Sequence, residues 1–505
     1  MSGQPESPVR QSPIRDRRVL SGQIGAVPTF RDPSGSLWLT ADFALRYIRP
    51  EALEETQAFL ASPLRTALER NGDLIESRIA EPGKHAGVLS GEFWLEHPRI
   101  DPITYPWEWV PAQWHAAAEL TLRVARQAID AGWTLKDATP LNILFQGARP
   151  VLVDVLSFER RDPRSDIWLA YGQFVRTFLL PLLAARYLSW PLSATIFTRD
   201  GYEPAFIYRA LRPWHRLNPR LLDVITLATW LERPGKNRQT PRKAGRPVDP
   251  ELATHILQKR IARLGKKTQH AAQTRNRSNW SAYSQTAIHY RPVDHEDKQN
   301  FVKNVLQRCG PSRVLDIGAN TGTYSSIAAD CGAEVVAIDA DAAAIESLWL
   351  TAARQNKPIT TLVANIARPT PAAGWRNSEQ LSLLDRLTGK FDLVLMLAVI
   401  HHLILREQIP LKLIGELCSL LTRRWLLLEW VPPSDPMYQE WLRGREDLYG
   451  NFTESDVLQA FAPWFSTVDR TELGNGRILL LLARISTSAV SPKAEPSSQT
   501  ELNPG

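Results

Sequence analysis

Hydrophobic and polar positions follow their clearest pattern in the second half of the chain, where they predict a strand, a turn, a helix and a second strand. Residues 314–317 are almost entirely apolar, as expected for a strand buried on both faces of a parallel sheet. Gly318 and Gly322 follow, and glycine allows a sharp turn and a close approach between backbone and ligand. The next apolar strand, 334–338, ends at Asp339. We predict a βαβ unit that binds a nucleotide-type cofactor, with Asp339 placed to accept hydrogen bonds from two ribose hydroxyls.

The pattern beyond this unit predicts further alternation of helices and strands, followed by an antiparallel hairpin. An alanine-rich helix is expected over 341–355, and Gly474-Asn475-Gly476 is a strong hairpin turn between the last two strands. The predicted C-terminal domain is therefore α/β, with a Rossmann-like seven-stranded sheet that ends in an antiparallel hairpin. Its other strands are expected over 360–364, 391–399, 424–432, 467–473 and 477–484.

The first half of the chain has a mixed pattern that predicts an α+β domain. A Pro-Ser-Gly turn between two segments of alternating apolar residues predicts a β-hairpin after Phe30. An aromatic and proline-rich connector, 104–111, precedes the longest helical pattern. Helices are expected over 51–72, 112–131, 167–188 and 219–231.

At 505 residues the chain is too long for one hydrophobic core, so two folded domains with linkers are expected. Eleven lysines and arginines lie between Arg233 and Arg277, opposed by only two acidic residues. We interpret this segment as a solvated linker; nucleic-acid binding is the alternative, which the lack of interleaved aromatic residues disfavours. The predicted organisation is a disordered tail over 1–27, the α+β domain over 28–232, the basic linker over 233–279, the α/β domain over 280–485 and a second disordered tail over 486–505.

Composition narrows the class of protein further. The mean hydropathy of -0.24 and the hydrophobic content of 44% are typical of a soluble globular protein. The sequence contains neither a signal-peptide pattern nor an apolar run long enough to cross a bilayer. Cys309, Cys331 and Cys418 lack metal-ligand spacing, so we expect a reducing cytoplasm, no disulfide bonds and no bound metal.

The residues of the glycine turn indicate which kind of cofactor is bound. A dinucleotide site has the pattern Gly-x-Gly-x-x-Gly, which lets a pyrophosphate rest on a helix N-terminus. Here Asp316 leads the turn and the middle glycine is missing. A carboxylate repels a pyrophosphate but can orient the amino end of a cofactor that carries an amino acid. The run resembles motif I of the class I S-adenosylmethionine methyltransferases. Two alternatives are a ligand-free Rossmann unit and an NAD-dependent oxidoreductase. The missing middle glycine and the terminal hairpin disfavour the oxidoreductase.

A second motif lies in the first half of the chain. Asp137 and Asn142 stand five residues apart, and Asp154 ends the second of the two strands that follow. This arrangement resembles the catalytic loop and metal-binding aspartate of protein-kinase-like folds. However, Leu135-Lys136 replaces the usual His-Arg, Val155-Leu156 replaces Phe-Gly, and the upstream glycine-rich loop and strand lysine are missing. We predict a kinase-like, non-catalytic domain; capping of turns, recognition of a substrate or nucleotide, and phosphotransfer all remain open for the motif.

Several motifs together resemble a single family. Taken in order, they are similar to a two-part family of bacterial class I methyltransferases that includes nodulation-associated host-specificity proteins. The likeness covers roughly 30–484 and implies S-adenosyl-L-methionine as the cofactor, but little about the acceptor. The motifs are LKDATPLNI, VLVDVLSFE, the pair Trp280 and Tyr283, VLDIGANTG, ARPTPAAGWRN with LSLLDR, and AVIHHL. Trp280 and Tyr283 are candidates for a lid over the ligand; ordinary packing is the alternative.

The resemblance also assigns residues to the cofactor and to catalysis. In open parallel sheets ligands bind at the carboxyl ends of the strands, and polar residues there are candidates for proton transfer. We expect a small-molecule acceptor and an N-terminal domain for recognition or scaffolding; the alternative is an inactive binding or regulatory scaffold. The candidates are Asp316, Gly318, Asn320 and Gly322 for the amino-acid end of the cofactor, Asp339 for its ribose, Asn365 for its adenine, and His401, His402 or Glu429 as general base.

Overall fold

The structure of the protein is a computed structural model that forms two compact units. The first unit consists of residues 1–278 with 341–386, and the second of 279–340 with 387–505. Trp280, Tyr283 and nearly all of both predicted tails lie outside the described residues. The structure describes residues 25–27, 31–81, 93–231, 248–273, 292–443 and 452–485.

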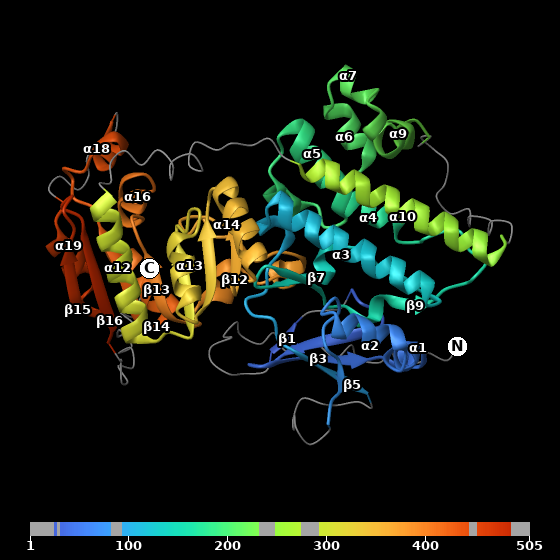
Figure 1. Ribbon diagram of the computed structural model, residues 1–505, viewed down its shortest axis with the longest axis horizontal. Helices are drawn as coiled ribbons and strands as arrows, with labels where there is room; N and C mark the ends of the chain where they lie inside the picture. Colours follow the sequence, from blue (N-terminus) through green and yellow to red (C-terminus); the bar gives the residue numbers. More distant parts are fainter. Residues whose placement is uncertain are drawn as a thin grey trace, which may run out of the picture. The chain divides into compact units, whose positions relative to one another are not determined.

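The second unit is built on a mostly parallel sheet (Figure 1). Its strands are β10 (Arg313–Ile317), β11 (Glu334–Asp339), β13 (Phe391–Met396), β14 (Thr422–Trp430), β15 (Phe465–Glu472) and β16 (Ile478–Arg484). The first four run parallel to one another, whereas β16 is antiparallel to both β14 and β15. With β12 (Ile359–Val363) the sheet has seven strands in the order β12-β11-β10-β13-β14-β16-β15. The predicted α/β fold with a terminal antiparallel hairpin is confirmed.

The central strands of this sheet carry long apolar runs. Leu426, Leu427 and Leu428 of β14 are fully buried, as are the leucines of β16 that pair with them. Strands whose two faces are both covered need no polar alternation, which is why the sequence shows continuous runs of leucine. The helices of this unit are α12 (Pro292–Cys309), α13 (Thr323–Asp330), α16 (Ile400–Leu405), α17 (Leu411–Leu421), α18 (Pro436–Leu442) and α19 (Glu454–Phe461).

The first unit begins with an antiparallel sheet. Its strands are β1 (Gly25–Val27), β2 (Gly35–Leu39), β3 (Phe43–Ile48), β4 (Arg78–Ile79) and β5 (Trp94–Pro98), in the order β1-β2-β3-β5-β4. The predicted hairpin is β2 with β3, but β1 lies in the predicted tail over 1–27, which is therefore wrong at its last three residues. The other elements of this region are α1 (Pro50–Leu60), α2 (Pro63–Arg70), and the strand pairs β6 (Trp133–Leu135) with β9 (Phe158–Arg160) and β7 (Ile143–Gln146) with β8 (Arg149–Leu152).

Helices make up most of the remainder of the first unit. The buried helix α3 (Pro111–Asp130) begins directly after the aromatic connector, as predicted. Pro181 lies in the first turn of α5, where a missing N–H is tolerated, and a π-helical turn joins α5 to α4. The bounds are α4 (Tyr171–Phe174), η4 (Val175–Leu179), α5 (Leu180–Leu188), α6 (Pro204–Ala210), α7 (Pro213–Arg216), α8 (Pro219–Leu221), η6 (Leu222–Thr226) and α9 (Leu227–Leu231), with short 3₁₀ turns η1 (Pro106–Glu108), η2 (Pro140–Asn142), η3 (Val155–Ser157) and η5 (Leu192–Phe197).

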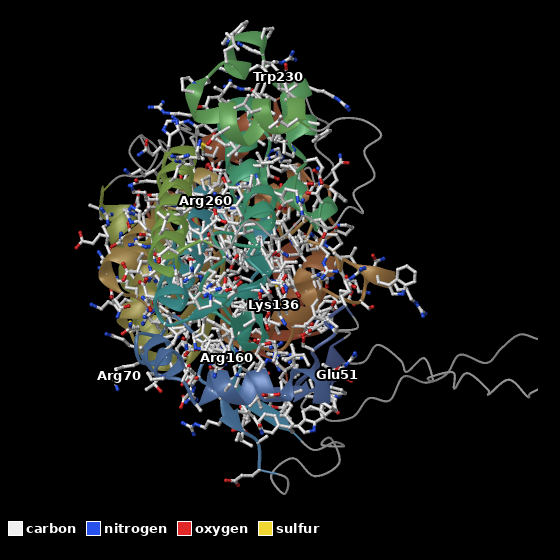
Figure 2. All side chains as sticks on the ribbon, turned by 90° about the vertical axis from the view of Figure 1, so that its right-hand side faces the viewer. Glu51, Arg70, Lys136, Arg160, Trp230 and Arg260 are labelled. Atoms are coloured by element: carbon white, nitrogen blue, oxygen red, sulfur yellow. The ribbon has the colours of Figure 1, made fainter. Side chains whose placement is uncertain are left out.

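The prediction of a basic linker over 233–279 is wrong for most of its second half. Residues 250–272 form α10 (Pro250–Ala272), a helix of 23 residues that packs against α3 and α5. Its buried stripe includes Leu257, Ile261 and Leu264, so apolar residues recur at helical spacing among the charges. Arg260 is exposed on the same helix (Figure 2) and pairs with Asp166 at 3.4 Å. The basic residues therefore form the solvated face of a packed helix.

Residues 341–386 interrupt the predicted boundary between the two domains. They contain α14 (Ala342–Gln355), β12, η7 (Trp375–Asn377) and most of α15 (Leu383–Leu387), and they belong to the first unit. Glu346 of α14 accepts a hydrogen bond from the N–H of Ala112 at 3.0 Å, and Trp349 meets Phe145 edge to face. These contacts join segments more than 200 residues apart. The predicted domain boundary at residue 280 assigned the two segments to different domains.

Candidate functional site

The glycine turn after β10 has the backbone geometry that its sequence requires. Gly318 has φ +75° and Gly322 has φ +84°, both in the left-handed region that favours glycine. A Cβ on Gly318 would lie 2.5 Å from Cγ2 of Val399, in the segment that follows β13. The N–H groups of Gly318 and Ala319 both donate to the carbonyl of Ile338, at 2.9 and 3.1 Å. The turn is thus held against the carboxyl ends of β11 and β13.

Asn320 and Asp339 meet in this turn. The backbone N–H of Asn320 donates to Oδ2 of Asp339 at 2.9 Å, which fixes the orientation of the carboxylate. Asn320 has φ +49°, which asparagine adopts more readily than most residues. Its side-chain oxygen is buried and has no hydrogen-bond partner within the part of the chain that the structure describes. An unsatisfied buried acceptor is costly, which makes this oxygen a candidate partner for a ligand donor.

Asp316 lies on β10, buried beneath the turn. The hydroxyl of Ser325, in the first turns of α13, donates to its Oδ2 at 2.6 Å. Burial raises the pKa of Asp316 to about 6; the hydrogen bond from Ser325 opposes this rise, and the charge of Asp339 adds to it. The carboxyl group therefore anchors α13 to β10, and it places a negative charge next to the turn above about pH 6.

A buried ionic network surrounds Glu429 at the end of β14. The Glu429 side chain is 0% exposed; its two oxygens contact Nζ of Lys298 at 2.5 Å and Nη1 of Arg477 at 3.2 Å. Arg477 also pairs with Asp435 at 2.8 Å, and Nζ of Lys298 lies 4.8 Å from the ring centre of Tyr324. Lys298, Arg477, Asp435 and Tyr324 gave no signal in the sequence, because each is an isolated residue of an ordinary helix, turn or loop.

This network changes the interpretation of Glu429. Both oxygens of this carboxylate are engaged in buried ion pairs, with Lys298 and with Arg477. Burial lowers the pKa of Lys298, while Glu429 opposes this effect. The structure therefore favours Glu429 as the centre of a structural network over Glu429 as a general base.

His401 and His402 lie in the first turn of α16, which follows the segment that contacts Gly318. Their ring centres lie 4.1 Å apart. Burial, with a smaller effect from nearby cationic groups, lowers the pKa of His401 well below its usual range and that of His402 to about 4. Nδ1 of His401 is buried without a hydrogen-bond partner among the residues that the structure places. Both rings are thus neutral at pH 7 and have the acceptor nitrogen of a neutral imidazole.

Asn365 lies in the first unit, directly after β12. Its side-chain oxygen accepts a hydrogen bond from the N–H of Ala367 at 2.9 Å, which forms an Asx turn. A carboxamide oxygen has a second lone pair, so the adenine assignment stays a prediction.

Residues of the second motif also contact one another, and they are joined by an arginine that the sequence did not reveal. Nη1 of Arg46, on β3, lies 3.0 Å from Oδ1 of Asp154. Oδ2 of Asp154 accepts from Ser157 at 2.5 Å and from Asn142 at 3.4 Å. The carboxylate is therefore bonded on both oxygens. Asp137 lies nearby in sequence and accepts from Gln173 at 3.3 Å.

These bonds favour the interpretation in which the motif residues tie turns together. In a kinase-like site Asp154 would bind magnesium, but here it pairs with Arg46 of β3. Three or more His, Cys, Asp or Glu side chains do not gather into a possible metal site anywhere in the described ranges. The prediction that the motif is not catalytic stays a prediction.

Comparison with known proteins shows what the chain is similar to. Residues 256–468 match the family model described as a methyltransferase domain. The chain is similar to methyltransferase domains over these residues. It is also 29% identical over 448 residues to the nodulation protein NoeA of Rhizobium meliloti (strain 1021), which covers 86% of this chain and 90% of that protein. The predicted resemblance to methyltransferases of nodulation type is confirmed.

Solved structures of methyltransferases align with part of the chain. Magnesium protoporphyrin IX methyltransferase from Synechocystis PCC 6803, with bound SAM, is 20% identical over 42% of this chain and 86% of that one, with a TM-score of 0.28. The N-methyltransferase NodS from Bradyrhizobium japonicum WM9 is 14% identical over 38% and 97%, with a TM-score of 0.29. None of the helices described for the present chain is long and apolar enough to span a membrane.

Proposed function

We propose that the methyltransferase domain binds S-adenosylmethionine at the carboxyl ends of β10 and β11 and methylates a hydroxyl or amine of a small-molecule acceptor. The observation that carries this proposal is the unpartnered, buried oxygen of Asn320 in a turn flanked by Asp316 and Asp339. An ammonium group is a donor and a cation, so it suits both the orphan acceptor of Asn320 and the carboxylate of Asp316. The residues of the turn therefore fit the amino-acid end of the cofactor.

The cofactor supplies a methyl group on a positively charged sulfur, so the chain chiefly needs to hold the acceptor in line and exclude water. Gly318 and Gly322 keep Cβ atoms away from the ligand. Asp339, already oriented by the N–H of Asn320, accepts hydrogen bonds from the ribose hydroxyls. Asn365 offers its second lone pair to the adenine amino group.

We assign proton transfer to the pair His401 and His402. Nδ1 of His401 is buried and has no partner within the described residues, so this nitrogen can accept a hydrogen bond from the attacking group. Burial lowers the pKa of His401, so the ring is a weak base that needs the bound acceptor in place before it takes up the proton. We expect His401→Gln to bind the cofactor with wild-type affinity but to lose most methyl transfer. The measurement is transfer of label from cofactor to a fractionated cell extract, with calorimetry of the same variant. Undiminished labelling by His401→Gln would remove the histidine from the mechanism.

Asp339→Ala should weaken cofactor binding by about one to two orders of magnitude, because a charged acceptor of two hydrogen bonds is lost. Calorimetric titration with S-adenosylmethionine measures the change. Asp341→Ala is the matched control: it removes an aspartate two residues away that caps α14 through the N–H groups of Ala343 and Ala344. The control should lose some stability and keep its affinity; equal affinities for wild type and Asp339→Ala would contradict the ribose assignment.

Cofactor binding should also weaken as the pH falls below about 6. Asp316 has a pKa of about 6 in the folded chain, above its ordinary value of 3.8, so it takes up a proton there as the pH falls. The proton removes the charge that attracts a cationic ligand, while the apo fold is relieved of a buried charge and gains stability. Calorimetric titration with S-adenosylmethionine across about pH 5 to 8 measures this loss of affinity. In Asp316→Asn the affinity should be lower and nearly independent of pH, and a wild-type profile in that variant would refute the role of Asp316.

For the N-terminal domain we propose a role in recognition or scaffolding. The internal bonding of Asp154 supports a role without phosphotransfer, and the contacts of Glu346 and Trp349 join this domain to α14. The rival of the whole proposal is an inactive scaffold. It predicts no binding of S-adenosylmethionine by the full chain, whereas the methyltransferase proposal predicts a rise in unfolding temperature with S-adenosylmethionine and none with NAD.

A further inference from the structure

Large apolar side chains are exposed on the small helices at one end of the first unit. The helix α6 packs against α9 and η6, and α7 also packs against η6, so these helices form one continuous structure (Figure 1). Figure 2 shows Trp230 at this end of the unit. We call the group the aromatic–arginine patch; its apolar members are Phe206 (53% exposed), Trp214 (63%), Leu217 (68%), Trp230 (57%) and Leu231 (79%).

The same helices are strongly basic. Between residues 204 and 231 there are four arginines, Arg209, Arg212, Arg216 and Arg220, and a single acidic residue, Asp223. Asp223 is bound by Lys267 of α10 at 2.7 Å, so the arginines outweigh it. The guanidinium of Arg212 lies 5.4 Å from the ring centre of Trp214. The patch thus combines exposed apolar surface with positive charge on one group of helices.

We propose that the aromatic–arginine patch docks the protein on the surface of an anionic lipid bilayer. Tryptophan and phenylalanine side chains insert favourably at the boundary between headgroups and acyl chains, and nearby arginines attract anionic headgroups. The indole of Trp230 has its N–H bonded to the hydroxyl of Tyr208 at 3.2 Å, which leaves its carbon edge for apolar contact. This inference does not depend on the methylation proposal.

The composition of the patch favours lipid over nucleic acid. Exposed aromatic rings and arginines suit both ligands, but Leu217 and Leu231 have no aromatic face on which a base can stack. A bilayer interface, by contrast, accepts leucine as well as aromatic side chains. The arginines favour anionic over neutral lipids, because a neutral bilayer surface does not attract positive charge.

The experiment is co-sedimentation of the full chain with vesicles of phosphatidylcholine, alone or mixed with phosphatidylglycerol. We expect binding to the mixed vesicles only, and weaker binding as salt is added. Trp214→Ala combined with Leu217→Ser should reduce the partition constant by about tenfold or more, because two exposed apolar side chains no longer insert. The matched control is Trp375→Ala, which removes a tryptophan that is also 63% exposed but lies on η7, outside the patch; this variant should bind like the wild type.

Arg209→Glu combined with Arg212→Glu tests the charge separately and should abolish the preference for phosphatidylglycerol. The proposal is overturned if the wild type does not sediment with the mixed vesicles, or if both double variants bind as it does. It is also overturned if sedimentation velocity shows that the wild type self-associates through the patch and the Trp214 variant does not. In that case a second copy of the chain is the occupant.

Discussion

Replacing Arg386 by methionine should lower the free energy of unfolding by about 3–5 kcal/mol, because it leaves a buried carboxylate without its cation. Arg386 and Glu108 are each 1% exposed, and the guanidinium contacts both carboxylate oxygens, at 2.5 and 3.1 Å. A further N–H of Arg386 donates to the carbonyl of Ile103 at 2.6 Å, so the pair fixes the aromatic connector to α15. Urea unfolding followed by tryptophan fluorescence measures the loss.

Two variants separate this effect from a general loss of charge. Arg470→Met removes the arginine of a solvent-exposed pair with Glu454 and should change stability little. The double variant Arg386→Met with Glu108→Leu removes both charges and should recover part of the stability, because no unpaired ion remains in the core. If Arg386→Met and Arg470→Met were equally stable, the buried pair would not stabilise the attachment of the aromatic connector to α15.

Gly318→Ala should weaken cofactor binding by more than about a hundredfold and lower the free energy of unfolding by roughly 2–5 kcal/mol. A left-handed φ of +75° is unfavourable for alanine, and its Cβ would lie 2.5 Å from Cγ2 of Val399. The turn would have to shift away from β13, which displaces Asn320 from the oxygen of Asp339. Calorimetry with S-adenosylmethionine and urea unfolding give the two quantities.

Gly332→Ala is the control for backbone strain. Gly332 has φ +93°, also left-handed, but nothing lies within 4 Å of a Cβ at that position. It ends the turn after α13 and lies outside the site, so this variant should lose only stability, by about 1–2 kcal/mol, and keep its cofactor affinity. If Gly318→Ala lost no more affinity than Gly332→Ala, close packing against Val399 would not be required for binding.

Local patterns predicted the seven-stranded sheet well because its signals are short and strong. The apolar run before Gly318, the acid at Asp339 and the hairpin turn at Gly474-Asn475-Gly476 each specify their own backbone, and the structure contains all three elements. Net charge, in contrast, misled the analysis at α10, because a high density of lysine and arginine concealed the buried stripe of Leu257, Ile261 and Leu264.

The sequence by itself determined the kind of fold in the second half and the turn proposed to hold the cofactor, since both follow from interactions among residues close along the chain. Only the tertiary structure decided how the polar residues are used. It placed Lys298 and Arg477 on Glu429, and Arg46 on Asp154, across separations of 131, 48 and 108 residues. No local pattern records such pairings, because they depend on which side chains are buried together after the chain has folded.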